Sequence, residues 1–313
     1  MSKILAREGD TVKKLIPWLC GVIVFQLCIY LYLNQLLVPS VGNVTVTRVD
    51  SGGVQSGVQQ LFSYDGSFRA DVSKDAVKIY STSDSVLRKE IDIGATEKLT
   101  YFSWLQDRNI ALAGISEPGK SGTICTLEPL NLVTDSQSIK PTITGLSKDA
   151  EIAGVAYSPD TNVVYIQVKS GVISTIYRTD ANNTLTKVGS TPSNIGRIAN
   201  LKSEDALLYD SVTTGRVYLV DKKGKQWISP QDGSEYALIG TDKNDNIYIA
   251  RLSSAQGSAK TTGGTGGNNT GNRLADMILV GGLNEAFTPL QQSGLPSPVN
   301  SITVTYDGTI KLT

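Results

Sequence analysis

The sequence predicts an all-β domain built from repeated four-stranded units and preceded by one membrane-spanning helix. Residues 15–38 form a stretch of 24 residues without a charged side chain. Most of the remaining chain consists of short strand-like runs bounded by Gly, Asp, Asn, Ser and Pro, with almost no helical apolar spacing. These runs recur in groups of roughly 40 to 50 residues, which is the spacing of four-stranded units.

The apolar stretch Leu15–Val38 predicts a transmembrane helix, since about 20 apolar residues cross a bilayer core. Basic residues are more frequent before this stretch than after it, where Arg48 is the first. The positive-inside rule therefore places residues 1–14 in the cytoplasm and residues 39–313 in the periplasm or outside the cell, with the helix in the cytoplasmic membrane. A cleaved signal peptide is the alternative, because Ser40 and Gly42 have small-x-small spacing, but the run exceeds the roughly 7 to 15 residues of a usual signal core.

Gln26 lies near the middle of this predicted span. A side-chain amide in hydrocarbon gains from a hydrogen-bond partner on another helix, so Gln26 is a candidate for binding a partner within the membrane. A tolerated lone polar residue is the alternative interpretation.

Six groups of strand-like runs follow, and each has an acidic residue in its first turn. These residues are Asp65, Asp107, Asp160, Glu204, Asp245 and Asp307. The steps between them are 42, 53, 44, 41 and 62 residues. The last step is long because residues 253–272 form a Gly/Ser/Thr/Asn-rich insertion, which we predict to be a flexible loop.

Four-stranded units at this period are typical of the blades of a β-propeller. The sixth group has only two strands, whereas Asn43–Asp50 reads as a strand without a unit of its own. We therefore predict a six-bladed β-propeller over residues 39–313, in which the N-terminal strand completes the last blade and few sheet edges remain exposed.

Three segments share a turn pattern: LFSYDGSFRADV at 61–72, AYSPDTNVVYI at 156–166 and VTYDGTIKL at 304–312. They resemble the F-S-P-D-G-x-x-hydrophobic turn of the bacterial WD40-like and TolB-type propellers. The resemblance implies the fold and no catalytic residue. The Gly-His and Trp-Asp pairs of WD40 proteins proper are missing from the sequence.

The composition excludes several function classes. There is no histidine, which removes Ser-His-Asp and Cys-His catalysis, histidine-ligated metals and imidazole pH switches. The 29 basic residues balance the 29 acidic ones, which argues against a nucleic-acid partner. Cys125 is the single cysteine after the predicted span, so no disulfide can form within the domain. No catalytic or cofactor-binding residue and no cofactor is predicted.

The candidate metal ligands are Asp242, Asn244 and Asn246, which place oxygen atoms at alternating positions as a calcium loop does. Turn-forming Asp and Asn residues between strands explain the same pattern without a metal, and we favour that interpretation.

An aromatic residue beside basic residues predicts a protein-binding surface. Trp227 lies close to Lys222, Lys223 and Lys225, and these four residues are candidates for binding a partner. In the strand that contains Phe102 and Trp104, alternation places these two aromatic side chains on one face, where packing between blades is expected.

The sequence therefore favours a non-catalytic, membrane-tethered interaction or scaffold subunit of a cell-envelope complex of the secretion, pilus or envelope-assembly type. Its expected partners are other envelope proteins. The alternative is a carbohydrate-active or lactonase-like enzyme with carboxylates in the propeller funnel, for which Asp65 with Asp71 and Glu204 with Asp205 are the candidate pairs. A sensor that passes ligand binding through the helix is a third possibility.

Overall fold

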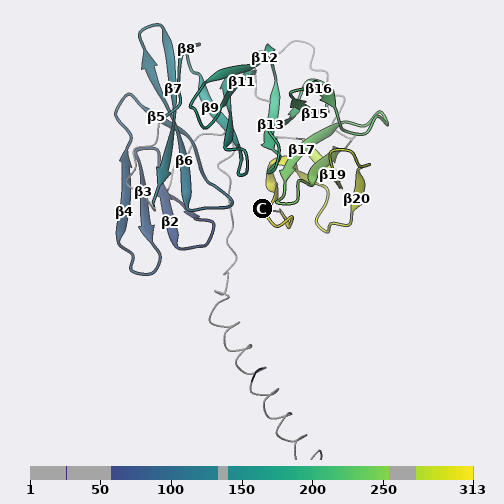
Figure 1. The fold of residues 1–313 in the computed structure, drawn as a ribbon, viewed down its shortest axis with the longest axis horizontal. Helices are drawn as coiled ribbons and strands as arrows, with labels where there is room; N and C mark the ends of the chain where they lie inside the picture. The colour runs from purple at the N-terminus through teal and green to yellow at the C-terminus, as the bar shows by residue number, and fades with distance from the viewer. Residues whose placement is uncertain (1–25, 27–57, 133–139, 254–272, 313) are drawn as a thin grey trace, which may run out of the picture. The chain divides into compact units, whose positions relative to one another are not determined.

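The computed structural model describes residue 26 and residues 58–132, 140–253 and 273–312 (Figure 1). The chain divides into two units, Met1–Val44 and Thr45–Thr313, and every described strand belongs to the second. Of the predicted membrane span only Gln26 is described, and it is helical and exposed. The described residues include no helix that is both long enough and apolar enough to span a membrane.

The described part of the second unit is all-β and forms six antiparallel sheets in chain order. Sheet 1 contains β1 (Gln59–Phe62), β2 (Phe68–Val72), β3 (Ala76–Ser81) and β4 (Leu87–Asp92). Sheet 2 contains β5 (Lys98–Trp104), β6 (Ile110–Gly119), β7 (Gly122–Asn131) and β8 (Thr142–Leu146). Sheet 3 contains β9 (Glu151–Ser158), β10 (Val163–Ser170), β11 (Ile173–Thr179) and β12 (Thr186–Ser193).

The second half of the unit repeats this arrangement. Sheet 4 contains β13 (Ile195–Asn200), β14 (Leu207–Ser211), β15 (Arg216–Asp221) and β16 (Gly224–Trp227). Sheet 5 contains β17 (Tyr236–Thr241), β18 (Ile247–Leu252), β19 (Leu274–Gly281) and β20 (Thr288–Leu290), with β21 (Ser297–Pro298) also paired to β19. Sheet 6 is the pair β22 (Ile302–Val304) and β23 (Ile310–Leu312), preceded by the 3-10 turn η3 (Val299–Ser301).

The six predicted first turns all join the first and second strands of these sheets. The strands β8, β19 and β20 were not predicted from the sequence. Strands β8 and β20 lie at sheet edges. Strand β8 has one buried residue and β20 has none, so neither shows a pattern of alternating apolar residues. The predicted closing strand Asn43–Asp50 and most of the predicted loop at 253–272 lie outside the described residues.

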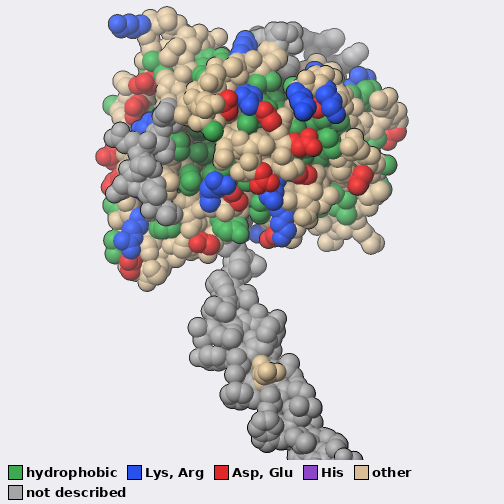
Figure 2. All heavy atoms as spheres, viewed as in Figure 1, with side chains coloured by type: hydrophobic (Ala, Val, Ile, Leu, Met, Phe, Trp, Pro, Cys, Tyr) green, Lys and Arg blue, Asp and Glu red, His purple; other side chains and the backbone are tan. Residues whose placement is uncertain are grey.

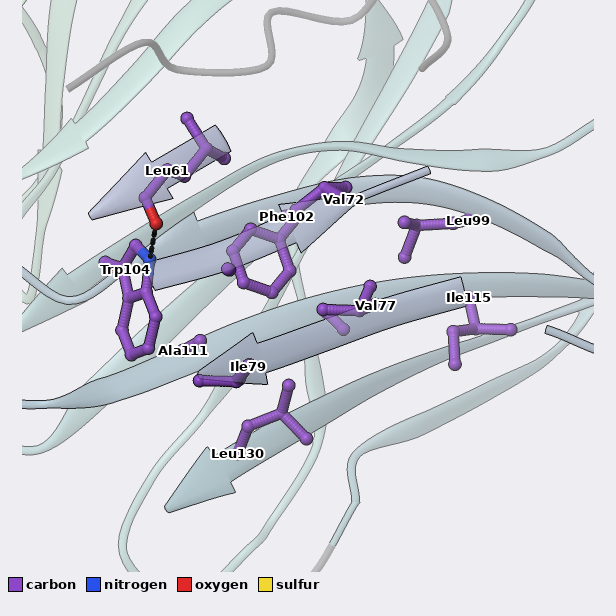
Figure 3. Close-up of a cluster of buried hydrophobic side chains, with 12 residues drawn as sticks. Leu61, Val72, Val77, Ile79, Leu99, Phe102, Trp104, Ala111, Ile115 and Leu130 are labelled. Atoms are coloured by element: carbon purple, nitrogen blue, oxygen red, sulfur yellow. Dashed lines mark hydrogen bonds between the residues drawn. The ribbon is translucent and has the colours of Figure 1, made fainter. Parts of the chain in front are cut away.

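Consecutive sheets pack face to face, each pair sharing one hydrophobic cluster. Between sheets 1 and 2 the cluster includes Val72, Ile79 and Phe102 (Figure 3). The clusters between the later neighbours include Leu127 with Ile152, Tyr165 with Leu207, Leu219 with Leu238, and Ala237 with Ile302. Inner strands are therefore covered on both faces, which explains why β14 is buried along its whole length. The sheets follow one another in chain order in Figure 1.

Phe102 and Trp104 confirm the prediction that they form core between sheets. Their rings meet edge to face at 6.1 Å, and the Trp104 indole donates a hydrogen bond of 3.1 Å to the backbone oxygen of Leu61 in sheet 1 (Figure 3). The bond satisfies the polar end of a buried indole while its apolar part packs in the core. Tyr101 packs on the opposite face, in the cluster shared with sheet 3.

Candidate functional site

A cleft of about 440 Å³ opens between sheets 3 and 4, and we call it the aromatic cleft. The wall formed by sheet 3 is apolar. It consists of Val172 in the β10–β11 turn and Ile173 at the start of β11, and each is 50% exposed. Its sheet 4 wall combines tyrosine rings, hydroxyl groups and one ammonium group. The residues lining the cleft are Val172, Ile173, Asn194, Tyr209, Ser211, Thr213, Thr214, Tyr218 and Lys225.

The aromatic side chains of sheet 4 form a row because of strand register. Tyr209 lies opposite Tyr218, and Tyr218 lies opposite Trp227, on the three adjacent strands β14, β15 and β16. Side chains directly opposite one another share a face of the sheet. The two tyrosine rings are accordingly 5.4 Å apart between centroids. The face they occupy is the one that packs toward sheet 3.

Two cations cover this row. The Lys225 ammonium lies 4.1 Å from the Tyr218 ring centroid and 5.3 Å from that of Tyr209, and the Arg216 guanidinium lies 4.0 Å from the Trp227 ring. Contacts of this kind stabilise by about 0.5 to 1 kcal/mol where exposed. None of the ion pairs in the described structure involves Lys225 or Arg216.

The structure thus separates the partner-binding candidates that the sequence grouped together. Trp227 and Lys225 lie on the aromatic face, whereas Lys222 and Lys223 are exposed in the β15–β16 turn. Of these four residues only Lys225 lines the cleft. Trp227 is half-buried and its indole donates to the Ser229 hydroxyl at 2.6 Å. The tyrosines and the Val172–Ile173 pair were missed, because only strand register and the packing of two sheets bring them together.

Asn194 contributes a polar atom to the cleft that has no partner. Its side-chain oxygen is buried and accepts no hydrogen bond from the described residues. A buried acceptor without a donor costs roughly 1 to 3 kcal/mol. Because this oxygen is buried, a ligand N–H group would reach it, and remove that cost, only after the Asn194 amide rotated toward the cleft.

The calcium candidates adopt the geometry of the turn alternative. One Asp242 oxygen accepts the backbone N–H groups of Asn244 and Asn246, at 2.9 and 3.0 Å. The other accepts the Asn246 amide at 2.8 Å and the Tyr248 hydroxyl at 3.0 Å. Protein donors therefore occupy both carboxylate oxygens. No cluster of three or more His, Cys, Asp or Glu suited to a metal occurs within the described ranges.

The first turns of the sheets come together, and three of their six acidic residues are paired with cations. Asp107 pairs with Arg108 at 2.5 Å, Asp307 with Lys243 at 2.6 Å, and Asp160 lies 3.8 Å from Lys202. Tyr306 lies in the first turn of sheet 6, and burial raises its pKa. The charge of Lys202 lowers this pKa, whereas Asp107, Asp160 and Tyr64 raise it further. Residues from the first turns of four other sheets thus act on this one hydroxyl group.

Three of the four candidate acid–base carboxylates, those of Asp65, Asp71 and Asp205, are held by hydrogen bonds or ion pairs. Glu204, the fourth, is exposed. Burial alone would raise the pKa of Asp65, but hydrogen bonds from Ser67, Asn109 and Ser63 outweigh it and lower that pKa. Asp71 pairs with Arg69 at 3.0 Å. Of the carboxyl groups in the described structure, those with a shifted pKa all have it lowered: Asp65, Asp84, Asp180, Asp205 and Asp232. A general acid needs the opposite shift at neutral pH.

Asp205 connects sheets 3 and 4, and acid is expected to weaken this contact. Tyr165 donates to its carboxylate at 2.6 Å and Arg178 at 2.7 Å. Burial alone would raise the pKa of Asp205, but these two partners lower it below 3.8. A carboxyl group whose pKa is lower in the folded state than in the unfolded state stabilises the fold fully at a pH above its unfolded-state pKa. This stabilisation is lost as the pH falls through the folded-state pKa. We expect Asp205→Asn to lower the melting temperature at pH 6, and the difference from wild type to shrink as the pH falls below 3.8, the ordinary pKa of the carboxyl group.

The matched control for this measurement is Asp75→Asn, which changes an exposed aspartate in the β2–β3 turn. It should leave the melting temperature near the wild-type value at every pH. If the difference in melting temperature between Asp205→Asn and wild type stays constant as the pH is lowered from 6 to 3, the ionised Asp205 carboxylate does not stabilise the contact between sheets 3 and 4.

By sequence, no protein-family model and no curated protein matches the chain. Solved structures do match its fold. A prolyl endopeptidase structure is 13% identical with a TM-score of 0.51, covering 82% of this chain and 38% of its own. A putative TolB from Agrobacterium tumefaciens is 13% identical with a TM-score of 0.47, covering 82% of this chain and 90% of its own.

The β-propeller domain of Cps50 (Swd1) from Myceliophteria thermophila is also similar, at 14% identity and a TM-score of 0.45, covering 77% of this chain and 72% of its own. The similar solved structures thus include the TolB-type and propeller proteins that the sequence resembles. At these identities the likeness concerns the fold alone, and the chain spans well under half of the endopeptidase.

Proposed function

We propose that this chain is a non-catalytic interaction or scaffold subunit of a cell-envelope complex of the secretion, pilus or envelope-assembly type. The observation that carries the proposal is the aromatic cleft, where exposed aliphatic side chains, tyrosine rings and an ammonium without a carboxylate partner share one surface. Aromatic residues with nearby cations are the groups that dominate protein–protein binding.

The paired carboxylates of the first turns argue against the enzymatic alternative. A glycosidase-like or lactonase-like site needs one carboxyl group that stays protonated near neutral pH. In the described structure the shifted carboxyl pKa values move the other way, and Asp107 and Asp307 are held by Arg108 and Lys243.

The proposal includes a membrane tether. The apolar segment Leu15–Val38 would anchor the chain in the cytoplasmic membrane, with residues 1–14 in the cytoplasm and the β domain in the periplasm or outside the cell. The anchor would restrict binding to proteins at the same membrane surface. Other envelope proteins are therefore the partners that we propose.

We also propose that the six sheets close as the blades of a propeller, with the strand Asn43–Asp50 completing the two-stranded sheet 6. The order of the clusters between consecutive sheets and the convergence of their first turns support it. Deleting residues 43–50 should then abolish cooperative thermal unfolding of the β domain, measured by circular dichroism. A transition as sharp as that of the wild type, at the same temperature, would reject the closure.

The test of function is crosslinking of the tagged full-length chain in its own host, followed by extraction in mild detergent and mass spectrometry. The expected result is a stoichiometric set of envelope proteins that disappears when the β domain is removed from the tagged anchor. Repeated recovery of the chain alone would reject the scaffold function.

A further inference from the structure

We infer that the aromatic cleft binds an acidic segment of a partner protein, in which a carboxylate lies beside aliphatic side chains. The inference rests on the proposed scaffold function and names the chemistry of the partner at this site. Three features of the cleft carry it: a cation that needs an anion, an apolar wall that needs covering, and an acceptor that needs an N–H group.

The cation is Lys225. Its ammonium lies over Tyr218 and Tyr209 and makes none of the described ion pairs, so its negative partners are the ring faces alone. None of the described residues that line the cleft is acidic. A carboxylate entering the cleft would therefore meet the ammonium without displacing another anion. Hydrogen bonds to charged groups are stronger than those between neutral groups.

The position of the ammonium also selects against a carbohydrate. Sugars bind aromatic sites by stacking on a free ring face, and here Lys225 already lies 4.1 Å from the centroid of Tyr218. Trp227, the third ring of the row, is covered by Arg216 at 4.0 Å. The occupied faces favour an anion over a stacked sugar.

The apolar wall is provided by Val172 and Ile173. Both belong to the few large hydrophobic residues of the described structure that are strongly exposed, at 50% each. Burying apolar surface stabilises by roughly 25 cal/mol per Å². An aliphatic side chain next to the carboxylate would cover this pair while the carboxylate reaches the opposite wall.

The acceptor is the Asn194 side-chain oxygen, which has no donor among the described residues. A polypeptide supplies an N–H group at every residue except proline, whereas a free fatty acid supplies none. This feature favours a peptide over a small aliphatic acid. A ligand that fills all three positions is an acidic, aliphatic peptide segment.

The surrounding charge is suited to such a segment. The hairpin of β15 and β16 carries Arg216, Lys222, Lys223 and Lys225 against Asp221 alone. On the face shown in Figure 2, by contrast, basic and acidic side chains are interspersed. A local excess of one sign accelerates the approach of oppositely charged partners.

The direct test measures binding of a peptide by the full-length chain in mild detergent at low salt. The probe is a fluorescein-labelled peptide with the core Leu-Glu-Leu, and the matched probes carry Leu-Gln-Leu and Leu-Lys-Leu. Fluorescence polarisation should rank them Glu above Gln above Lys. The variant Lys225→Gln should bind the Glu peptide about ten-fold or more weakly, which corresponds to about 1.4 kcal/mol.

Two further variants make the result specific. Lys223→Gln removes the same charge two residues away, outside the cleft, and should retain most of the affinity. Ile173→Ser should weaken the Glu and Gln peptides by the same factor, because its contact is apolar. Equal binding of the three peptides, equal binding by Lys225→Gln and wild type, or no binding of the Glu peptide up to millimolar concentration would each overturn the inference.

The crosslinking experiment separates this inference from the function on which it rests. If wild type recovers no partner, the scaffold function fails. If wild type and Lys225→Gln recover the same partners in the same amounts, the scaffold function stands and the aromatic cleft is not the binding site. The expected result is a loss of at least one partner in Lys225→Gln and its retention in Lys223→Gln.

Discussion

Replacing Arg197 with methionine is expected to lower the free energy of unfolding by roughly 1 to 3 kcal/mol for each buried carbonyl group that it leaves without a donor. Arg197 lies in β13 of sheet 4 and is 7% exposed. Its guanidinium donates to the backbone oxygens of Ile302 at 2.7 Å and Val299 at 3.0 Å, both next to or in sheet 6. Longer bonds reach Asn300 at 3.2 Å and Ile239 of sheet 5 at 3.4 Å.

The large effect follows from what the substitution leaves behind. Methionine keeps an apolar chain of similar length but donates no hydrogen bond, so the carbonyl groups of Ile302, Asn300 and Ile239 lose this donor. The Val299 oxygen also loses it but keeps the backbone N–H of Ile302. Each unsatisfied buried group costs roughly 1 to 3 kcal/mol. Arg197 also joins sheet 4 to sheet 6, which are not neighbours in the chain, so its loss weakens the long-range assembly of the domain.

The measurement is chemical denaturation of the full-length chain, followed by circular dichroism. Arg251→Met is the matched control, since Arg251 makes a half-exposed ion pair of 2.9 Å with Asp276. Exposed pairs of this kind contribute about 0 to 1 kcal/mol. Equal midpoints for Arg197→Met and Arg251→Met would show that the buried guanidinium does not hold the sheets together.

Phe102→Ala is expected to cost about 3 to 5 kcal/mol by opening a cavity between sheets 1 and 2. Phe102 is 1% exposed and packs in the cluster that includes Val72, Ile79 and Trp104 (Figure 3). Removing its ring takes away the edge-to-face contact with Trp104 as well as buried apolar surface. Both walls of the cavity belong to sheets held by their own hydrogen bonds, so they can collapse only partly.

The control is Phe102→Leu, which keeps most of the buried volume and should cost clearly less than the alanine variant. Fluorescence of the indole reports the same site, because a cavity beside Trp104 changes its surroundings. A loss below about 1 kcal/mol for Phe102→Ala would show that the sheets repack and that this cluster is not a rigid interface.

The pattern of the sequence was sufficient to predict the repeat, because the signals of a strand and its turn are local. The six first-turn acidic residues, from Asp65 to Asp307, all fall between the first two strands of a sheet, as predicted. Alternation likewise placed Phe102 and Trp104 correctly in the core. The edge strands β8 and β20 escaped prediction because edge strands bury too little to show a pattern.

The candidate site was only half visible in the sequence. Trp227 and Lys225 were identified because they lie close together in the chain. Tyr209 and Tyr218 join them only through cross-strand register, and Val172 with Ile173 only through the packing of sheet 3 against sheet 4. Lys222 and Lys223 lie close to them in the sequence but do not line the cleft, because proximity in sequence does not give the direction of a side chain in a turn.

Local chemistry determined the class of fold, since strand alternation, turn residues and an uncharged 24-residue stretch can each be recognised within a short segment. The tertiary structure decided which charges are neutralised and which stay available. It paired Asp205 with partners from another sheet, buried Arg197 among the carbonyls of sheets 5 and 6, and left Lys225 over tyrosine rings. These outcomes depend on contacts between residues far apart in the chain, where sequence spacing carries no distance information.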